Sequence, residues 1–341
     1  MQRTLGFITG AVGAAILLAG CGKTYPVGAI APTAPPIKPS VTSVYTLPTP
    51  PASALPQGIA SAPSVSNCAA GVIWFTEQSN NSIGTLNQAA KFTTLQLPNA
   101  GSQPYGITCG PDGQIWFTEY AGNRIGRYDT STGNFAEFSI PTSSAQATSI
   151  VLGADGGLWF TESGTGKMGR ADAQTGAITE YATGGTTPLD AAEGSDGSVW
   201  FTLEGSNQVG SITTGGGVTL HNVSAASQPF AIIAGSDHAL WFTEHASGKL
   251  GRIVPSNGAL TEVALTGCAS PGALEQGTDG NFYVLCSGGS PVVVQYNPQT
   301  TKQKSFALKS GSVPQEAVIG FDNKLYFTDS GLNALDQFTY Q

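Results

Sequence analysis

One phrase, Trp-Phe-Thr, returns along the sequence at nearly constant spacing. It contains all five tryptophans of the chain, and its full copies begin at Trp74, Trp116, Trp159, Trp200 and Trp241. Two variant copies begin at Tyr283 and Tyr326, and the steps between the seven are 42, 43, 41, 41, 42 and 43 residues. A period near 40, built from short apolar runs and glycine turns, is typical of a β-propeller with one blade per repeat. The spacing therefore predicts an all-β, seven-bladed β-propeller.

The residues around each phrase predict four antiparallel strands per blade. Asp lies four residues before the aromatic residue in six copies and is usually followed by Gly, as in Asp112-Gly113. Asp-Gly between apolar runs favours a type I′ hairpin turn, with positive φ at both central residues. An apolar residue nine positions after the aromatic, usually followed by Gly, opens a third strand, as at Ile125-Gly126. A fourth strand follows at 135–140 in the same repeat.

The N-terminal segment of the propeller is predicted to close the ring. The third strand of the seventh repeat, at 335–338, has no fourth strand between it and Gln341. A segment ahead of the first repeat, 43–48, resembles the fourth-strand segment at 93–98. We expect 42–47 to form the outer strand of the last blade, which removes an exposed sheet edge.

The first 41 residues carry the features of a lipoprotein leader and a tether. A 14-residue apolar run from Leu5 to Leu18 follows Arg3 and ends in Leu18-Ala19-Gly20-Cys21. The run fits a signal peptide, and its end resembles a bacterial lipobox, which implies cleavage before Cys21 and acylation there; the alternative is a plain signal peptide with a chance Cys. We predict a signal at 1–21, a Pro-rich tether at 22–41 and the propeller at 42–341. The expected location is the bacterial cell envelope, on the periplasmic side of the outer membrane or at the cell surface.

Composition limits the partners of the chain. Only 11% of the residues are charged, the net charge is −8, and Lys and Arg form no cluster. Nucleic-acid binding needs a basic surface and is not expected. We expect a monomer that contacts the membrane through its lipid anchor only and binds an envelope protein or a small ligand.

Four cysteines remain after Cys21, and an exported compartment permits disulfides. Cys268 lies just before the predicted innermost strand of blade six, and Cys286 ends the next strand, so we predict a bridge between them. Cys68 and Cys109 are predicted on the inner strands of blades one and two. They either pair across neighbouring blades or remain buried thiols. The spacing of Cys and His does not indicate zinc.

Carboxylates end equivalent strands in five of the seven repeats, so we expect them to encircle one mouth of the central channel. They are Glu77, Glu119, Glu162, Glu244 and Asp329. One interpretation is a site for a cation or polar ligand, with Tyr105 and Phe230 as apolar contacts. The other is that each carboxylate accepts hydrogen bonds within its own loop. Repetition in most blades favours the structural interpretation.

The repeat resembles a known family. The pattern Asp-Gly-x-(Ile/Leu)-Trp-Phe-Thr-Glu, followed by Asn-x-Ile-Gly-Arg, is clearest at 112–127, 155–170 and 237–252. It resembles the virginiamycin B (streptogramin B) lyase family across residues 42–341. The resemblance implies the propeller fold. In active members it implies a Mg²⁺-dependent elimination that opens the ester of a cyclic depsipeptide, with a His as the base.

The residues implied by the resemblance are only partly present. The catalytic His is expected fourteen residues before the phrase-final Glu, where this chain has Tyr105, Thr148, Leu189, Phe230, Gly272 and Gln315. A metal-binding carboxylate is expected two residues earlier, where it has Gln103, Gln146, Thr187, Gln228, Ser270 and Val313. A metal would rely on Glu119, Glu162 and Glu244, and His245 is the candidate substitute base. The sequence therefore favours a non-catalytic binding module, with a Mg²⁺-dependent lyase as the alternative.

Overall fold

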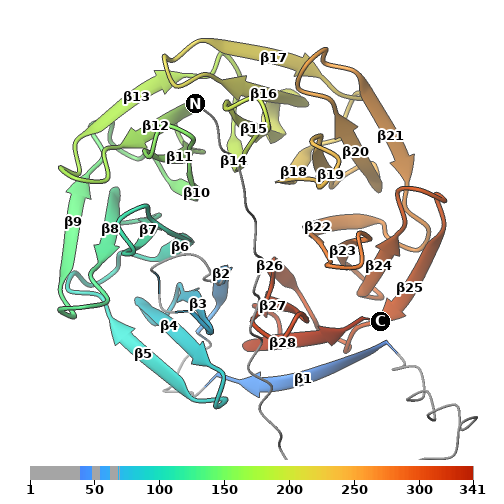
Figure 1. The fold of residues 1–341 in the computed structure, drawn as a ribbon, viewed down its shortest axis with the longest axis horizontal. Coiled ribbons are helices and arrows are strands. Elements are labelled where there is room, and N and C mark those ends of the chain that lie inside the picture. The colour runs from blue at the N-terminus through green and yellow to red at the C-terminus, as the bar shows by residue number, and fades with distance from the viewer. Residues whose placement is uncertain (1–38, 48–53, 62–67, 69, 341) are drawn as a thin grey trace, which may run out of the picture. The chain divides into compact units, whose positions relative to one another are not determined.

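The computed structural model describes residues 39–47, 54–61, 68 and 70–340. Seven four-stranded antiparallel sheets surround a common centre, which confirms the predicted seven-bladed all-β propeller (Figure 1). The predicted signal peptide with Cys21, and residues 22–38 of the predicted tether, lie outside the described residues. Within those described ranges, no helix has the length and apolar character needed to cross a membrane.

In each blade the strands are given from the centre outward. Blade one holds β2 (Pro56–Ser61), β3 (Val72–Glu77), β4 (Ser82–Asn87) and β5 (Phe92–Gln96), and blade two holds β6 (Pro104–Cys109), β7 (Ile115–Glu119), β8 (Arg124–Tyr128) and β9 (Phe135–Ser139). Blade three holds β10 (Ala147–Leu152), β11 (Leu158–Glu162), β12 (Lys167–Ala171) and β13 (Ile178–Ala182), and blade four holds β14 (Pro188–Glu193), β15 (Val199–Leu203), β16 (Gln208–Ile212) and β17 (Val218–Asn222). A short 3-10 helix, η1 (Glu204–Ser206), follows β15. The other three blades hold β18 (Pro229–Ala234), β19 (Leu240–Glu244), β20 (Lys249–Ile253) and β21 (Leu260–Ala264); β22 (Ser270–Gln276), β23 (Phe282–Ser287), β24 (Val292–Tyr296) and β25 (Gln303–Ala307); and β26 (Pro314–Ile319), β27 (Leu325–Asp329), β28 (Ala334–Thr339) and β1 (Ser40–Thr46).

The ring closes through its N-terminal strand, as predicted. Strand β1 pairs antiparallel with β28, from Ser40 opposite Thr339 to Thr46 opposite Ala334. The observed strand covers 40–46 instead of the predicted 42–47, because β28 extends to Thr339 and offers partners that far. Leu47 lies beyond the strand, where its amide donates to the Asn333 carbonyl at 3.2 Å and its side chain is buried. The last blade thus joins segments from both ends of the propeller.

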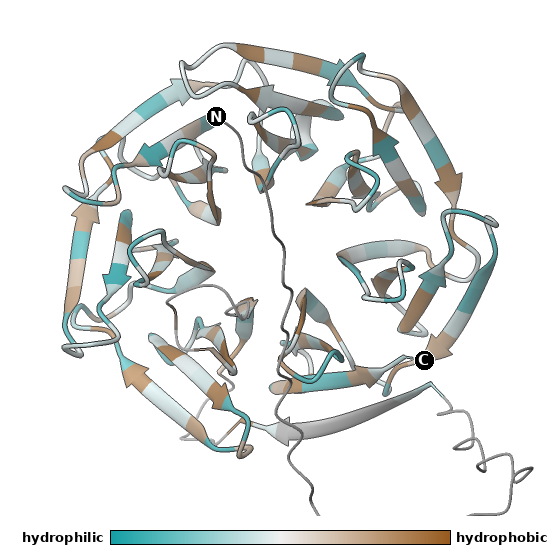
Figure 2. Ribbon diagram, viewed as in Figure 1, coloured by the Kyte–Doolittle hydropathy of each residue, from teal (hydrophilic) through white to brown (hydrophobic). Residues whose placement is uncertain are grey.

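The hydrophobic core lies between neighbouring blades. One cluster, for example, packs Trp116 and Ile125 of blade two against Ile150, Leu158 and Phe160 of blade three. Figure 2 shows the hydrophobic residues distributed over all the blades of the ring. Strands that carry the Trp-Phe-Thr phrase are therefore covered on both faces, which explains why their apolar residues run consecutively instead of alternating.

The Trp and the Phe of the phrase each contact a residue that recurs with the repeat. The Asp four residues before the Trp accepts a hydrogen bond from the indole, as between Trp159 Nε1 and Asp155 Oδ1 at 3.1 Å. Blade one has Ala70 in place of this Asp, and Trp74 Nε1 lacks a hydrogen-bond partner among the described residues. The Phe packs on the Gly of the third strand: a Cβ on Gly126 would lie only 2.2 Å from the Phe117 ring.

The Thr of the phrase joins six of the seven blades to the next blade. Thr118 Oγ1 donates to the carbonyl of Thr148 in blade three at 3.0 Å and accepts from the Gly106 amide at 2.8 Å. The donation to the next blade recurs at six of the seven junctions, and the contact of Thr328 with the Gln57 carbonyl closes the ring. Blade six has Leu285 at this position. The repeated Thr is thus an interblade connection.

The turn before the phrase differs from the predicted type I′ geometry. Only its second residue has positive φ, 76° at Gly113, 63° at His238 and 57° at Asn323, and the preceding Asp does not. The Asp112 carboxylate accepts the amide of Gln114 at 3.1 Å, and this local bond holds the Asp in ordinary geometry. The Gly113 amide donates to the Gly110 carbonyl at 3.2 Å. A single left-handed residue therefore ends each of these turns.

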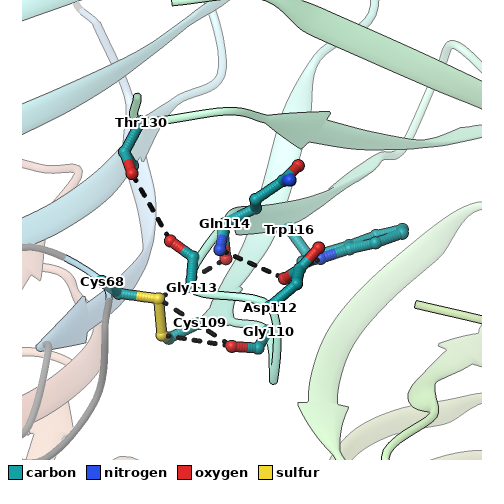
Figure 3. The surroundings of a disulfide bond; sticks show 8 residues. All are labelled: Cys68, Cys109, Gly110, Asp112, Gly113, Gln114, Trp116 and Thr130. Carbon is teal, nitrogen blue, oxygen red and sulfur yellow. Dashed lines mark hydrogen bonds between the residues drawn. A yellow bond between two sulfur atoms is a disulfide. The ribbon is translucent and has the colours of Figure 1, made fainter. Parts of the chain in front are cut away.

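The structure contains two disulfides in the part of the chain that it describes. Cys268 is joined to Cys286, with the Cα atoms 5.5 Å apart, and Cys68 is joined to Cys109, at 6.1 Å. Cys109 ends β6, but Cys68 lies in the connection between β2 and β3 and not on an inner strand as expected. That connection is long, because Pro56 pairs with Glu77, 21 positions on, while Pro104 pairs with Glu119, 15 positions on. Figure 3 shows the bridge beside the turn at Gly110, where it ties blade one to blade two.

Candidate functional site

A central cavity of about 490 Å³ lies where the innermost strands of the seven blades meet. Its walls come from β2, β6, β10, β14, β18, β22 and β26, which face the centre of the ring in Figure 1. Most of the wall is aliphatic, with contributions such as Ile107, Ile150 and Ile232. A concave, mainly apolar space with a few polar groups is typical of a small-molecule site.

At the cavity mouth lie the positions where the family resemblance implies the catalytic His. Each directly follows the inner-strand residue that pairs with the phrase-final residue, and six of the seven line the cavity: Gln57, Tyr105, Thr148, Leu189, Phe230 and Gln315. The seventh is Gly272. In blade one, Pro56 pairs with Glu77, so Gln57 is the equivalent residue. The longer β2–β3 connection changes the spacing there, so counting along the sequence does not find it. None is a His. Two residues earlier stand Leu55, Gln103, Gln146, Thr187, Gln228, Ser270 and Val313, none of them a carboxylate.

Aromatic side chains gather at this mouth in two pairs. The Tyr105 and Tyr120 rings lie 5.9 Å apart between centroids, and the Phe230 and His245 rings lie 5.5 Å apart. Tyr105 and Phe230 line the cavity, as the sequence suggested for apolar contacts. His245 stands behind Phe230, half-buried, with Nδ1 3.1 Å from the Pro271 carbonyl oxygen. The candidate base therefore supports an aromatic wall and does not itself line the cavity.

The five phrase-final carboxylates do not encircle the mouth, contrary to the arrangement expected from the sequence. Their side chains belong to residues that are 0 or 1% exposed, and none lines the cavity: Glu77, Glu119, Glu162, Glu244 and Asp329. The strand does not end in solvent. Neighbouring loop residues and the first residues of the next strand cover the carboxylate and supply its hydrogen-bond donors.

Each of these carboxylates accepts hydrogen bonds from nearby residues of its own blade. Glu162 accepts from Thr165 Oγ1 at 2.7 Å and Glu244 from Ser247 Oγ at 2.8 Å. Glu77 accepts from Ser82 Oγ at 2.6 Å, and Glu119 from Arg124 Nε at 2.9 Å. Asp329 accepts from Ser312 Oγ and from the amides of Val313, at 2.9 Å, and Leu332, at 3.1 Å. This geometry agrees with the structural interpretation of the repeat.

Burial strongly raises the pKa of two of the phrase-final carboxyl groups. It raises the pKa of Glu162 and of Glu244 to about 7, and hydrogen bonds from Thr165 and Ser247 only partly oppose this. The second carboxylate oxygens of Glu119, Glu162 and Glu244 have no hydrogen-bond partner among the described residues. The three belong to different blades, and no set of three or more His, Cys, Asp or Glu in the described ranges is placed to hold a metal. They do not fit a shared Mg²⁺ site.

Three other carboxylates line the cavity, and none of them was predicted as a site residue. They are Asp190 on β14, Glu275 on β22 and Glu316 on β26. Among the described residues that line the cavity, the one other acidic residue is Glu193, which is exposed, and none is Lys, Arg or His. The described wall of the lumen therefore carries acidic groups and no basic ones.

The three differ in how well they are bonded. Asp190 accepts from Ser149 Oγ of blade three and from the amides of Ala191 and of Ile232 in blade five, each at 2.8 Å. Glu316 accepts only the Ile59 amide of blade one, at 2.9 Å through Oε2. Glu275 accepts only the neighbouring Gln276 amide, at 2.8 Å through Oε1. Glu275 and Glu316 each keep one oxygen free of any hydrogen bond within the described residues.

Burial raises the pKa of all three lumen carboxyls, and repulsion between their charges adds to the shift for Glu316. Burial, followed by the charges of Asp190 and Glu275, raises the pKa of Glu316 to about 8. Burial raises the pKa of Glu275 to about 7 and also raises that of Asp190. Burial and the Glu316 and Asp190 charges raise the pKa of Tyr105 to about 12. The groups thus interact electrostatically through one enclosed space.

Breaks in the repeat could have located this cluster. At the position of Asp190 and Glu316 the other blades have small residues, Gly58, Gly106, Ser149, Ala231 and Ala273. A Cβ on Gly106 would lie 2.3 Å from the Thr148 carbonyl oxygen, so close approach of the strands favours small residues here. A carboxylate at such a position is unexpected, because close packing of the strands favours a small residue there. Comparing equivalent inner-strand positions reveals that departure from sequence alone.

Comparison with known proteins places the chain among lyase-related propellers. The virginiamycin B lyase from Staphylococcus aureus is 27% identical, with a TM-score of 0.80, and the match covers 89% of this chain and all of that one. A streptogramin B lyase is 26% identical, with a TM-score of 0.79 and 87% and 97% of the two chains covered. The hydrazine synthase of Kuenenia stuttgartiensis, 14% identical over 84% and 95% of the chains with a TM-score of 0.69, shares the fold alone.

A further match is a catalytically inactive His-to-Ala variant of the Staphylococcus aureus lyase with quinupristin, 27% identical over 89% and 99% of the two chains, with a TM-score of 0.78. Among curated proteins there is no significant match. The model of the virginiamycin B lyase family matches residues 42–337, nearly the whole propeller. The chain belongs to the virginiamycin B lyase family.

Proposed function

We propose that this chain is an exported, lipid-anchored member of the family that binds a ligand in its central cavity without cleaving it. The observation that carries the proposal is the composition of the cavity mouth. All seven positions equivalent to the implied catalytic His hold other residues, and six of them line the cavity. The cavity is large enough for a small molecule, while the residue that would remove a proton is missing from its wall.

The alternative is a Mg²⁺-dependent lyase, which family membership and the similarity to two lyase structures favour. The described residues fit that chemistry poorly. The retained phrase-final carboxylates are enclosed in their own blades, and His245 lies behind Phe230 with Nδ1 against a backbone carbonyl. A base or metal site would need a different set of residues.

The membrane attachment remains a proposal that rests on the lipobox ending at Cys21. Acylation of that Cys would hold the propeller at the cell envelope, and the Pro-rich tether would keep it clear of the bilayer. We propose that the membrane is contacted through the anchor alone and that the propeller, as a monomer, meets a small ligand or an envelope protein. Incorporation of labelled palmitate into the chain, lost in Cys21→Ser, is the expected result.

The catalytic question is tested with the full chain, a streptogramin B antibiotic and Mg²⁺, followed by mass spectrometry of the antibiotic. We expect the cyclic compound to remain unopened. A known virginiamycin B lyase assayed in parallel serves as the positive control. Metal-dependent opening that is lost in Glu119→Gln or Glu244→Gln would overturn the proposal in favour of the lyase.

A further inference from the structure

The cavity concentrates negative groups without a positive partner. Asp190 and Glu316 occupy equivalent positions on blades four and seven, at well-separated places around the ring, and Glu275 lies on blade six (Figure 1). The ion pairs of the described residues lie elsewhere: six involve a Lys or Arg on the third strand of a blade, and the seventh joins Lys324, just before β27, to Asp322. Enclosed like charges are costly unless a proton neutralises them or a cation compensates them.

Two of these carboxyls also have hydrogen-bonding capacity left over. The free oxygens are Oε1 of Glu316 and Oε2 of Glu275, since each residue accepts only one amide through its other oxygen. Both residues line the cavity deep within the ring and keep part of their surface on its lumen. These two oxygens face the lumen and have no donor among the described residues, so they are available to a ligand. A ligand with a hydrogen-bond donor and a positive charge would satisfy these oxygens in their ionised form.

The remaining wall selects the rest of the ligand. Aliphatic side chains such as Ile107 and Ile232 make most of the lining, and Tyr105 and Phe230 offer rings at the mouth. Rings of this kind bind apolar groups and also attract cations. A cavity of about 490 Å³ takes a molecule of many atoms, far more than one ion needs.

We infer that the central cavity binds an organic cation, a protonated amine or guanidine on an apolar body. The cationic group donates to the free oxygens of Glu275 and Glu316, and Asp190 adds its charge from the opposite wall. The apolar body extends along the aliphatic wall toward Tyr105 and Phe230. This inference rests on the proposed function and gives its ligand a chemical class.

Binding of a cation is coupled to protons. Glu316 faces Asp190, Glu275 and Tyr105 across the lumen, and its pKa of about 8 leaves much of it protonated at neutral pH. Because a bound cation favours the ionised carboxylate, binding releases protons and becomes tighter as the pH rises toward about 8 to 9.

The test uses three probes of matched shape on the full chain: 4-phenylbutylamine, which is a cation, 4-phenylbutanol, which is neutral, and 4-phenylbutyrate, which is an anion. Isothermal titration measures their affinities. We expect the amine to bind about tenfold or more tighter than the alcohol, the scale of a hydrogen bond to a charged group. We expect the butyrate to bind weakest. Titration in two buffers of different ionisation enthalpy should show proton release at about neutral pH.

Variants locate the binding. Glu316→Gln and Glu275→Gln should each reduce the affinity advantage of the amine over the alcohol. The control Glu180→Gln makes the same change on the outer strand β13, where Glu180 pairs with Lys167, and should leave the advantage intact. If a lumen variant fails to fold, the three probes and the proton release on the unmodified chain still decide the matter.

The outcomes separate this inference from the proposed function. Equal binding of the amine and the alcohol would overturn the cation inference and leave a binding module for neutral ligands. Displacement of the amine by micromolar Ca²⁺ or Mg²⁺ would also overturn it, in favour of a metal in the lumen. Cleavage of a streptogramin would overturn the proposed function, whatever the probes do.

Discussion

The molecule has two sets of buried carboxylates, and they differ in how they relate to the repeat. The phrase-final set recurs in five blades, is enclosed by its own loops and lies outside the cavity. The lumen set, Asp190, Glu275 and Glu316, occurs once per blade in three blades and faces one shared space. Residues that recur around a propeller serve every blade in the same way, while a single ligand breaks that symmetry. Departures from the repeat are therefore the better guide to the site.

Loss of a phrase-final carboxylate should affect stability most at Asp329. Asp329→Ala removes the acceptor for Ser312 Oγ and for the amides of Val313 and Leu332, which leaves three donors near the closing blade without their partner. We expect a loss of about 3 kcal/mol or more in the free energy of unfolding, measured by urea denaturation. Asp329→Asn, which keeps an acceptor, should lose less. A loss below about 1 kcal/mol for the Ala variant would show that the loop does not depend on this side chain.

Neutralising a carboxylate of the lumen set should raise the stability of the fold instead of lowering it. The raised pKa of Glu316 means that its ionisation destabilises the fold, with no penalty below about pH 4 and the full penalty above about pH 8. Glu316→Gln keeps an amide oxygen for the Ile59 amide and removes that charge. We expect it to stabilise the chain by about 1–2 kcal/mol at about pH 9 and to be neutral at about pH 4, a range reduced for solvent in the lumen. Destabilisation at both pH values would assign Glu316 a structural role.

A smaller change is expected for a phrase-final Glu made neutral in the same way. The pKa of Glu162 is raised to about 7, so ionisation of this group also destabilises the fold as the pH rises through 7. Glu162→Gln keeps an acceptor for Thr165 Oγ1, and we expect a gain of about 1 kcal/mol or less at about pH 8. Amine affinity, measured on the same sample, should not change. A loss of amine affinity in this variant would erase the distinction between the two sets.

Sequence periodicity was sufficient to predict the blades, their four strands and the closing strand, because these depend on local residues repeated seven times. The position of β1 was wrong by one or two residues at its ends, since pairing with β28 decides them. The Asp before each Trp was interpreted as a turn residue only, yet its carboxylate also bonds the indole, a contact within one hairpin that composition alone does not specify.

The site was less predictable than the fold. The phrase-final residues were expected around the mouth because they end equivalent strands, but the direction of a side chain at a strand end depends on the loop that follows it. The place of Gln57 was hidden because the β2–β3 connection changes the spacing in blade one. The lumen cluster joins residues from blades four, six and seven, and only the closed ring brings them to one space.

We propose that the functional groups of this propeller lie in its lumen and not at the ends of the phrase strands. A crystal structure of the chain with 4-phenylbutylamine would locate them. We expect the amine nitrogen within hydrogen-bonding distance of the Glu275 or Glu316 carboxylate, with the phenyl ring toward Tyr105 and Phe230. An amine bound at Glu162 or Glu244, with the lumen holding only water, would contradict it.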